Sequence, residues 1–303
     1  MDTKMRKKVG PRPQKVNIRK APEETGGIGI RVGYASAAAA GISGDAAASC
    51  GLPGGSRALI LSDGMGKGIK AAAGSRLVVT RLRKNLKVGM PVAKAIKEVN
   101  RYMIEQAEAA SHKSAGGTGF ANGQTGSAVE QVNPAPGQGG TDFADGQCSS
   151  DCADEDFATV DLTVIDRQSC RARFYKMGAA TSFIMRQGRV RKIKGAALPV
   201  GIIPRLRLTH ISAVLKEGDL IVMVSDGITD ADRKDPEACW LCDYLSQNIY
   251  RDNFDAGRLS ARQIAADILT EAEARYGGRE RDDLTVAAAL IVKATQTVQG
   301  NEE

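Results

Sequence analysis

The sequence predicts an α+β fold in which two antiparallel β-sheets pack face to face and helices cover their outer surfaces. Short apolar segments in the middle of the chain follow one another across tight turns, as antiparallel strands do. Two helical patterns precede this region and two follow it, whereas a doubly wound fold would need regular strand and helix alternation. The 303 residues, 42% of them hydrophobic, are enough for one large core.

The first part of the domain combines two strands with a pair of helices. Residues 28–35 and 57–61 have the apolar composition of strands. Residues 67–86 repeat apolar side chains at helical spacing, and Pro91 opens a second helix that we expect to reach residue 103. The first helical pair therefore follows a strand directly.

After residue 156 the chain turns mainly to β structure. Short turns such as Gln187-Gly188 join neighbouring apolar segments, which indicates antiparallel pairing. We expect strands at residues 157–165, 171–177, 182–185, 189–193, 206–213, 220–224 and 284–292. Two late helices are expected at residues 236–250 and 260–276.

The chain divides into one domain, residues 26–293, with a short tail after it at residues 294–303. The net charge of +7 lies entirely in residues 1–20, which hold eight basic residues and one acid, so no nucleic-acid surface is indicated on the domain. We interpret residues 1–25 as a solvated basic linker, with weak attraction to anionic lipid as the alternative. Residues 108–156 carry eight acids and one Lys among Gly, Ser and Gln, a composition that predicts a disordered acidic insertion.

Cysteine usage and hydropathy indicate a cytoplasmic protein. No segment approaches the roughly 18 consecutive apolar residues of a membrane-spanning helix, and no signal peptide is recognisable. Cys239 and Cys242 form a Cys-x-x-Cys pair, but neither histidine stands at zinc-finger spacing. We expect reduced thiols and no zinc, in the cytoplasm or at the cytoplasmic face of a membrane.

Acidic residues recur where predicted strands begin or end. Asp63 and Asp226 each follow an apolar strand within a Ser-Asp-Gly tripeptide. Asp282 precedes the last strand, with Asp283 as the neighbouring alternative, and Asp45 lies upstream. Clustered carboxylates stay ionised together only if a cation neutralises them, and oxygen ligands without histidine favour Mg²⁺ or Mn²⁺. The pattern predicts a divalent-cation centre, although each acid alone has a simpler role as a turn or N-cap carboxylate.

The motifs, in this order, resemble those of the metal-dependent protein phosphatases of type 2C, in particular the bacterial branch typified by stage II sporulation protein E. The resemblance spans residues 28–292. The segments that carry it are residues 44–45, 62–68, 157–166, 178–183, 198–202, 225–227 and 282–286. It implies a four-layer α/β/β/α sandwich with two Mn²⁺ or Mg²⁺ ions at one end of the sheets.

The resemblance also implies a role for each acid. Asp63 would bridge both ions, and the carbonyl of Gly64 would join the shell of the second. Asp226 and Asp282 would bind the first ion, while Asp45 would bind or orient water at the second. A water bridging the two ions would attack the phosphate without a phosphoenzyme, which makes Asp63 and Asp226 the expected catalytic residues.

Two departures from the family pattern leave the general acid unassigned. Met65 stands where many type 2C enzymes have a histidine, and no arginine precedes Asp45 at the spacing of the phosphate-binding arginine of the animal enzymes. Lys67 either assists phosphate binding or is a solvated residue at a helix start. Asp230 either helps a third ion or caps the end of a strand.

The resemblance implies a phosphoserine substrate on an anti-anti-sigma factor and a role in activating a sporulation sigma factor. Residues 67–86 and 91–105 occupy the place of the branch's regulatory switch helices, through which a homodimer is expected. Relatives in the branch carry a membrane region before the phosphatase domain, so membrane contact is expected here only if such a region is encoded elsewhere. The alternative function is a phosphatase-like binding module with weak or no catalysis. A two-metal nuclease is disfavoured by the 4% aromatic content and by a basic excess confined to the tail.

Overall fold

The structure, a computed structural model, describes residues 27–66, 68–115, 157–196, 198–232, 238–249, 260–279 and 281–294, without the side chains of residues 110–115 and 248. The predicted N-terminal tail, residues 116–156 of the predicted insertion, Lys67 and the C-terminal residues 295–303 lie outside the described residues.

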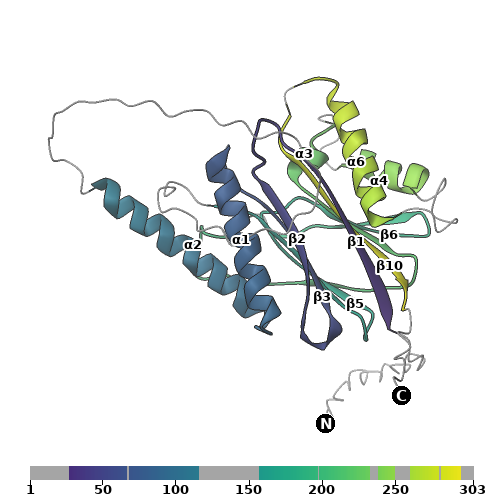
Figure 1. The fold of residues 1–303 in the computed structure, drawn as a ribbon, viewed down its shortest axis with the longest axis horizontal. Helices are drawn as coiled ribbons and strands as arrows, with labels where there is room; N and C mark the ends of the chain where they lie inside the picture. The colour runs from purple at the N-terminus through teal and green to yellow at the C-terminus, as the bar shows by residue number, and fades with distance from the viewer. Residues whose placement is uncertain are drawn as a thin grey trace, which may run out of the picture.

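Two five-stranded antiparallel sheets pack face to face, which confirms the predicted fold class (Figure 1). The strands of the first sheet are, in spatial order, β1 (Ile28–Ala37), β10 (Leu284–Lys293), β9 (Leu220–Val224), β6 (Ser182–Arg186) and β7 (Arg189–Ile193). Those of the second are β2 (Asp45–Gly51), β3 (Arg57–Asp63), β4 (Val160–Asp166), β5 (Arg171–Met177) and β8 (Ile211–Val214).

Helices cover the outer face of each sheet. Helices α1 (Ile69–Lys87) and α2 (Val92–Ala115) share a core with the second sheet, whereas α4 (Cys239–Tyr244) and α6 (Ala261–Tyr276) share one with the first (Figure 1). The short elements are the 3₁₀-helix η1 (Pro53–Gly55), α3 (Asp226–Thr229) and the π-helix η2 (Leu245–Ile249). None of the described helices is long and apolar enough to span a bilayer.

Alternation along the strands divides the apolar core into layers. In β3, Ala58 and Ile60 pack with the residues of α1 and α2, whereas Leu59 and Leu61 belong to the layer between the sheets. Successive side chains of a strand point to opposite faces, so one strand contributes to two layers. Both faces of the central strands are therefore buried, and only strand ends can present polar groups to solvent.

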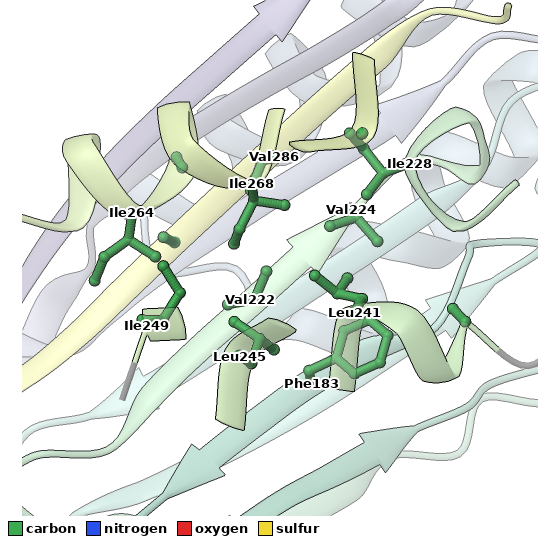
Figure 2. Close-up of a cluster of buried hydrophobic side chains, with 14 of the residues drawn as sticks. Phe183, Val222, Val224, Ile228, Leu241, Leu245, Ile249, Ile264, Ile268 and Val286 are labelled. Carbon is green, nitrogen blue, oxygen red and sulfur yellow. The ribbon is translucent and has the colours of Figure 1, made fainter. Parts of the chain in front are cut away.

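The layer beneath α4 and α6 shows the same alternation from the first sheet. Val222 and Val224 of β9 point toward these helices, where they meet Ile264 and Ile268 of α6 (Figure 2). Phe183 of β6 fills the same layer, and all five side chains are fully buried. This packing holds the C-terminal end of β9, from which α3 begins.

The helix expected at residues 236–250 consists, in its described part, of α4 followed by the π-helix η2, and the strand expected at residues 157–165 begins at Val160. Three further elements differ from the sequence-based expectations. Strand β2 was not predicted, because its sequence from Asp45 to Gly51 is rich in Ala and has low β-propensity; pairing with β3 stabilises it. The strand expected at residues 206–213 is only the short β8. Helix α2 continues to Ala115, since this stretch is rich in Ala, so the first eight residues of the predicted insertion are helical.

Candidate metal centre

Two of the predicted ligand segments are joined by the pairing of β2 with β3. Asp45, the first residue of β2, lies directly opposite Asp63, the last residue of β3. The backbone N–H of Gly64 donates to the carbonyl of Gly44 at 3.1 Å, which extends the contact one step beyond the strands. Sheet pairing alone therefore places two carboxylates side by side.

The other two segments meet at the adjoining end of the first sheet. The backbone N–H of Ser225 donates to the carbonyl of Thr285 at 3.0 Å, and the Thr285 N–H donates to Ser225 Oγ at 2.9 Å. Asp226 follows as the first residue of α3. The carboxylate of Asp283 connects the two sheets, because its Oδ2 accepts from the Gly44 N–H at 2.5 Å.

Close backbone packing explains two of the glycines in these motifs. A Cβ on Gly64 would lie 1.8 Å from the carbonyl oxygen of Ala71 in α1. A Cβ on Gly227 would lie 2.3 Å from the carbonyl oxygen of Asp283. Only glycine permits these approaches, which bring helix and strand ends into contact around the acids.

Asp63 is in an unfavourable environment for a free carboxylate. Its pKa is raised to about 8, mainly by burial and in addition by the neighbouring charges of Asp226, Asp45 and Asp282. All the predicted carboxylate ligands therefore lie close enough to interact electrostatically with Asp63.

The same causes act on two other acids of the cluster. The pKa of Asp45 is raised to about 7, mainly by burial, with the charges of Asp226 and Asp283 contributing to this increase. Burial also raises the pKa of Asp226, followed by the charges of Asp282 and Asp230. Among the described residues, no basic side chain is a principal influence on the pKa values of these three acids.

The residues present fit a hard divalent cation. Asp45 Oδ2 is buried and has no hydrogen-bond partner among the described residues, a costly state that a cation would relieve. A donor set of carboxylate and carbonyl oxygens suits Mg²⁺ or Mn²⁺. In the part of the chain that the structure describes, however, no group of three or more His, Cys, Asp or Glu side chains forms a ready-made coordination shell. The acids share a location, and metal binding stays a prediction for Asp45, Asp63, Gly64, Asp226 and Asp282.

The two neighbouring acids before β10 have different surroundings. Asp283 accepts from the backbone N–H groups of Ala39 and Gly44 through its Oδ1 and Oδ2, at 2.6 and 2.5 Å. Asp282 is exposed, and its carboxylate accepts a local hydrogen bond from the Asp283 N–H, through Oδ1 at 2.8 Å. These surroundings favour Asp282 as the metal ligand and give Asp283 a structural role. The sequence could not show the role of Asp283, because its two hydrogen-bond partners lie 244 and 239 positions away.

Arg281 is a further structural residue that the sequence analysis missed. Its guanidinium donates to the carbonyls of Ala37 and Ala38 at 3.1 and 3.0 Å. Together with Asp283 it fixes the loop that leads from β1 into Asp45. No local pattern in the sequence indicates these long-range contacts.

The remaining candidates are only partly placed. Met65, two residues after Asp63, is 49% exposed, and its thioether has no proton to offer a leaving group. Asp230 occupies the C-cap position of α3, where its backbone N–H donates to the carbonyl of Asp226 at 2.8 Å. This backbone contact does not involve the carboxylate, whose role at a third ion or as a cap stays a prediction.

Comparison with known sequences identifies the family. The chain matches the stage II sporulation protein E family over residues 53–130 and 135–291. It is 27% identical over 266 residues to stage II sporulation protein E of Bacillus subtilis (strain 168), which covers 86% of this chain and 26% of the relative. The protein of the same name from Priestia megaterium is 27% identical over 265 residues, covering 86% of this chain and 36% of the relative. The chain thus spans about a quarter to a third of the length of these relatives.

Solved structures agree with the sequence match. The PP2C phosphatase domain of Bacillus subtilis SpoIIE, solved with a fragment of its regulatory domain, superposes with a TM-score of 0.65 at 26% identity, over 89% of this chain and 65% of that chain. The RsbU and RsbW domains of a Mycobacterium tuberculosis protein share the fold, with a TM-score of 0.59 at 18% identity, over 89% and 62%. The chain therefore belongs to the stage II sporulation protein E family and carries the type 2C phosphatase domain of that family.

Proposed function

We propose that this domain is a metal-dependent phosphatase that hydrolyses phosphoserine on a protein substrate. The observation that carries the proposal is the meeting of Asp45, Asp63, Asp226 and Asp282 at one end of the sheets, where burial and mutual repulsion raise the pKa of Asp63 to about 8. Such an arrangement of acids is typical of sites that hold divalent cations. Membership of a phosphatase family supports the same reaction.

The protein's part in this reaction is to hold oxygen ligands in place. When bound, two Mn²⁺ or Mg²⁺ ions would activate water and neutralise charge on the phosphate. Asp63 and the carbonyl of Gly64 would contribute from the end of β3, with Asp45 from the paired start of β2. Asp226 and Asp282 would contribute from the first sheet. Because strand pairing and glycine contacts fix all these segments, little reorganisation of the backbone is needed for binding.

The finer assignment rests on the family alone. We propose a cytoplasmic enzyme whose substrate is a phosphorylated protein of the anti-anti-sigma type, acting in the control of sporulation sigma factors, with a homodimer formed through α1 and α2. The relatives are named for sporulation, and one structural neighbour contains an RsbU domain, which supports a regulatory protein substrate.

The test is hydrolysis of a phosphoserine peptide and of p-nitrophenyl phosphate, with Mn²⁺ and with EDTA. We expect turnover only with Mn²⁺, and a loss of about 10³-fold or more in Asp226→Ala, because one ligand of the centre is removed. The matched control is Asp166→Asn, which removes an acid from the far end of β4, where it accepts from the N–H groups of Gln168 and Ser169.

Each outcome decides between the candidate functions. Full activity in EDTA or in folded Asp226→Ala would reject the metal-dependent mechanism. Mn²⁺ binding without hydrolysis of either substrate would instead support the phosphatase-like binding module. Equal losses in Asp226→Ala and Asp166→Asn would show that the loss is not specific to the site.

A further inference from the structure

The pairing of β3 with β4 changes at the residue that carries the predicted bridging carboxylate. The register of the two strands, continued two residues beyond the Leu61–Asp161 pair, places Thr159 opposite Asp63. This is a hydrogen-bonded position, at which two residues of a regular antiparallel ladder exchange two backbone hydrogen bonds. Only one is present, from the Thr159 N–H to the Asp63 carbonyl at 2.8 Å. The Asp63 N–H donates instead to the side chain of Thr159, with 2.8 Å between the nitrogen and Oγ1.

A second side chain takes the place of the missing backbone donor. Ser62 Oγ donates to the carbonyl of Thr159 at 2.6 Å. Ser62 is fully buried and Thr159 is 9% exposed, so neither bond is replaced readily by water. Two residues further along, the Met65 N–H donates to the carbonyl of Phe157 at 2.9 Å. Met65 thus makes the backbone bond that the corresponding N–H of Asp63 does not make.

We propose that Thr159 is a positioning residue for Asp63 in metal binding, an inference that rests on the proposed function. The direction of the Asp63 N–H fixes the orientation of its peptide, and with it the direction in which the carboxylate leaves the end of β3. The Thr159 hydroxyl holds that N–H away from the carbonyl that a regular ladder would offer. Without the hydroxyl, the N–H turns to that carbonyl and the carboxylate turns with it.

The chain offers a matched control for this role. Thr163 lies on the same face of β4, four residues along, and is fully buried. Its Oγ1 has no hydrogen-bond partner among the described residues. Replacing Thr by Val removes a hydroxyl and keeps the shape, so Thr163→Val deletes an unused hydroxyl, whereas Thr159→Val deletes the one that binds Asp63.

The experiment measures Mn²⁺ affinity directly, from the electron paramagnetic resonance signal of free Mn²⁺ during titration. We expect Thr159→Val to bind Mn²⁺ about 10–100-fold more weakly than the parent, as is typical when a partner of a metal ligand is lost. Thr159→Ser, which keeps the hydroxyl, and Thr163→Val should bind like the parent. In phosphoserine hydrolysis, the Mn²⁺ concentration needed for half-maximal activity should be higher for Thr159→Val than for the parent, and unchanged for Thr159→Ser and Thr163→Val.

Urea unfolding in EDTA measures whether each variant is folded without metal, so that a loss of Mn²⁺ affinity can be distinguished from a loss of stability. If folded Thr159→Val binds Mn²⁺ as tightly as the parent, the proposal is overturned while the proposed function stays intact. The same holds if Thr159→Val and Thr163→Val weaken Mn²⁺ binding equally. If Thr159→Val does not fold, Ser62→Ala provides the test, because it frees the Thr159 carbonyl for the Asp63 N–H and should weaken Mn²⁺ binding in the same range. A parent protein that binds no Mn²⁺ rejects the proposed function and this inference together.

Discussion

At the scale of single residues, neighbouring acids in this site have separate tasks. Asp283 holds the loop before β2 through two backbone N–H groups, whereas Asp282 is exposed and repels Asp63 and Asp226. The carboxylate of Asp283 therefore has hydrogen-bond partners within the protein, whereas that of Asp282 is available to an ion. Adjacent substitutions can distinguish the two roles.

We expect Asp282→Asn and Asp283→Asn to have opposite effects. In EDTA, Asp283→Asn should lower the free energy of unfolding by about 1–3 kcal/mol, because an amide nitrogen cannot accept one of the two N–H bonds. Asp282→Asn should leave that free energy unchanged or slightly higher, since it removes repulsion, but should weaken Mn²⁺ binding. Urea denaturation and Mn²⁺ titration of both variants check this, and equal stability losses would contradict it.

A second prediction at this scale concerns pH. Burial raises the pKa of Tyr34 in β1 from 10.0 to about 12. A raised pKa in the folded state means that the stability contribution is complete below pH 10 and is lost as the pH rises toward 12. The free energy of unfolding of the parent should therefore fall more steeply between pH 10 and 12 than that of Tyr34→Phe, by at most about 1.4 kcal/mol per pH unit. Parallel curves for the two proteins would be the contrary result.

At the scale of elements, the site depends on how α1 meets the end of β3. The backbone of Gly64 packs on the first turns of α1, where the carbonyl of Ala71 leaves no space for a side chain. Gly74 lies further along α1, and a Cβ there would meet only the Phe157 carbonyl, at 3.8 Å. The two glycines on one interface thus serve different purposes.

We expect alanine to separate these two glycines. Gly64→Ala should destabilise the domain by about 1–3 kcal/mol or more, because the added methyl group must displace the helix. Gly74→Ala should stabilise it by about 0.5–1 kcal/mol, through the lower entropy of the unfolded chain and higher helix propensity. Thermal and urea unfolding measure both changes, and a neutral Gly64→Ala would show that α1 is not held tightly against the site.

At the scale of the whole molecule, a buried ion pair of one sheet connects the two sheets through a serine of the other. Lys176 of β5 donates to Asp161 of β4 and also to Ser182 Oγ of β6 in the opposite sheet, at 2.6 Å. Ser182 Oγ donates in turn to Asp161 Oδ2 at 2.5 Å. Burial lowers the pKa of Lys176, and the nearby Asp161 opposes that change. All three side chains are buried, so the pair acts in the core between the sheets.

Removing one partner should cost much more than removing both. We expect Lys176→Met to lower the free energy of unfolding by about 3–5 kcal/mol, because it leaves the Asp161 charge buried and unpaired. The double variant Asp161→Leu/Lys176→Met should recover most of that loss, since apolar replacements of buried pairs are often neutral. Urea denaturation of the single and double variants forms the cycle, and additive losses would contradict the coupling.

Much of the fold could be predicted because its signals are local. The limits of β5 and β7, and the helix that became α6, follow from apolar spacing and turn residues within a few positions. Strand β2 could not be predicted, because its alanines carry no β signal until β3 pairs with them. The prediction also ended α2 too early, at residue 103. The polar composition of the segment from residue 108 was interpreted as disorder, whereas its first, Ala-rich residues continue the helix to Ala115.

The sequence by itself determined that Asp63 and Asp226 stand at strand ends, because apolar runs and Ser-Asp-Gly tripeptides mark those ends locally. The order of the motifs along the chain added Asp45 and Asp282 to the group before any of the four could be placed. Only the tertiary structure decided that Asp283 binds a loop and that Thr159 replaces a backbone bond at Asp63. Those contacts join residues from 96 to 244 positions apart. The Thr159 bond forms only once the chain segments of β3 and β4 pair, and the Asp283 bonds form only once the two sheets have packed.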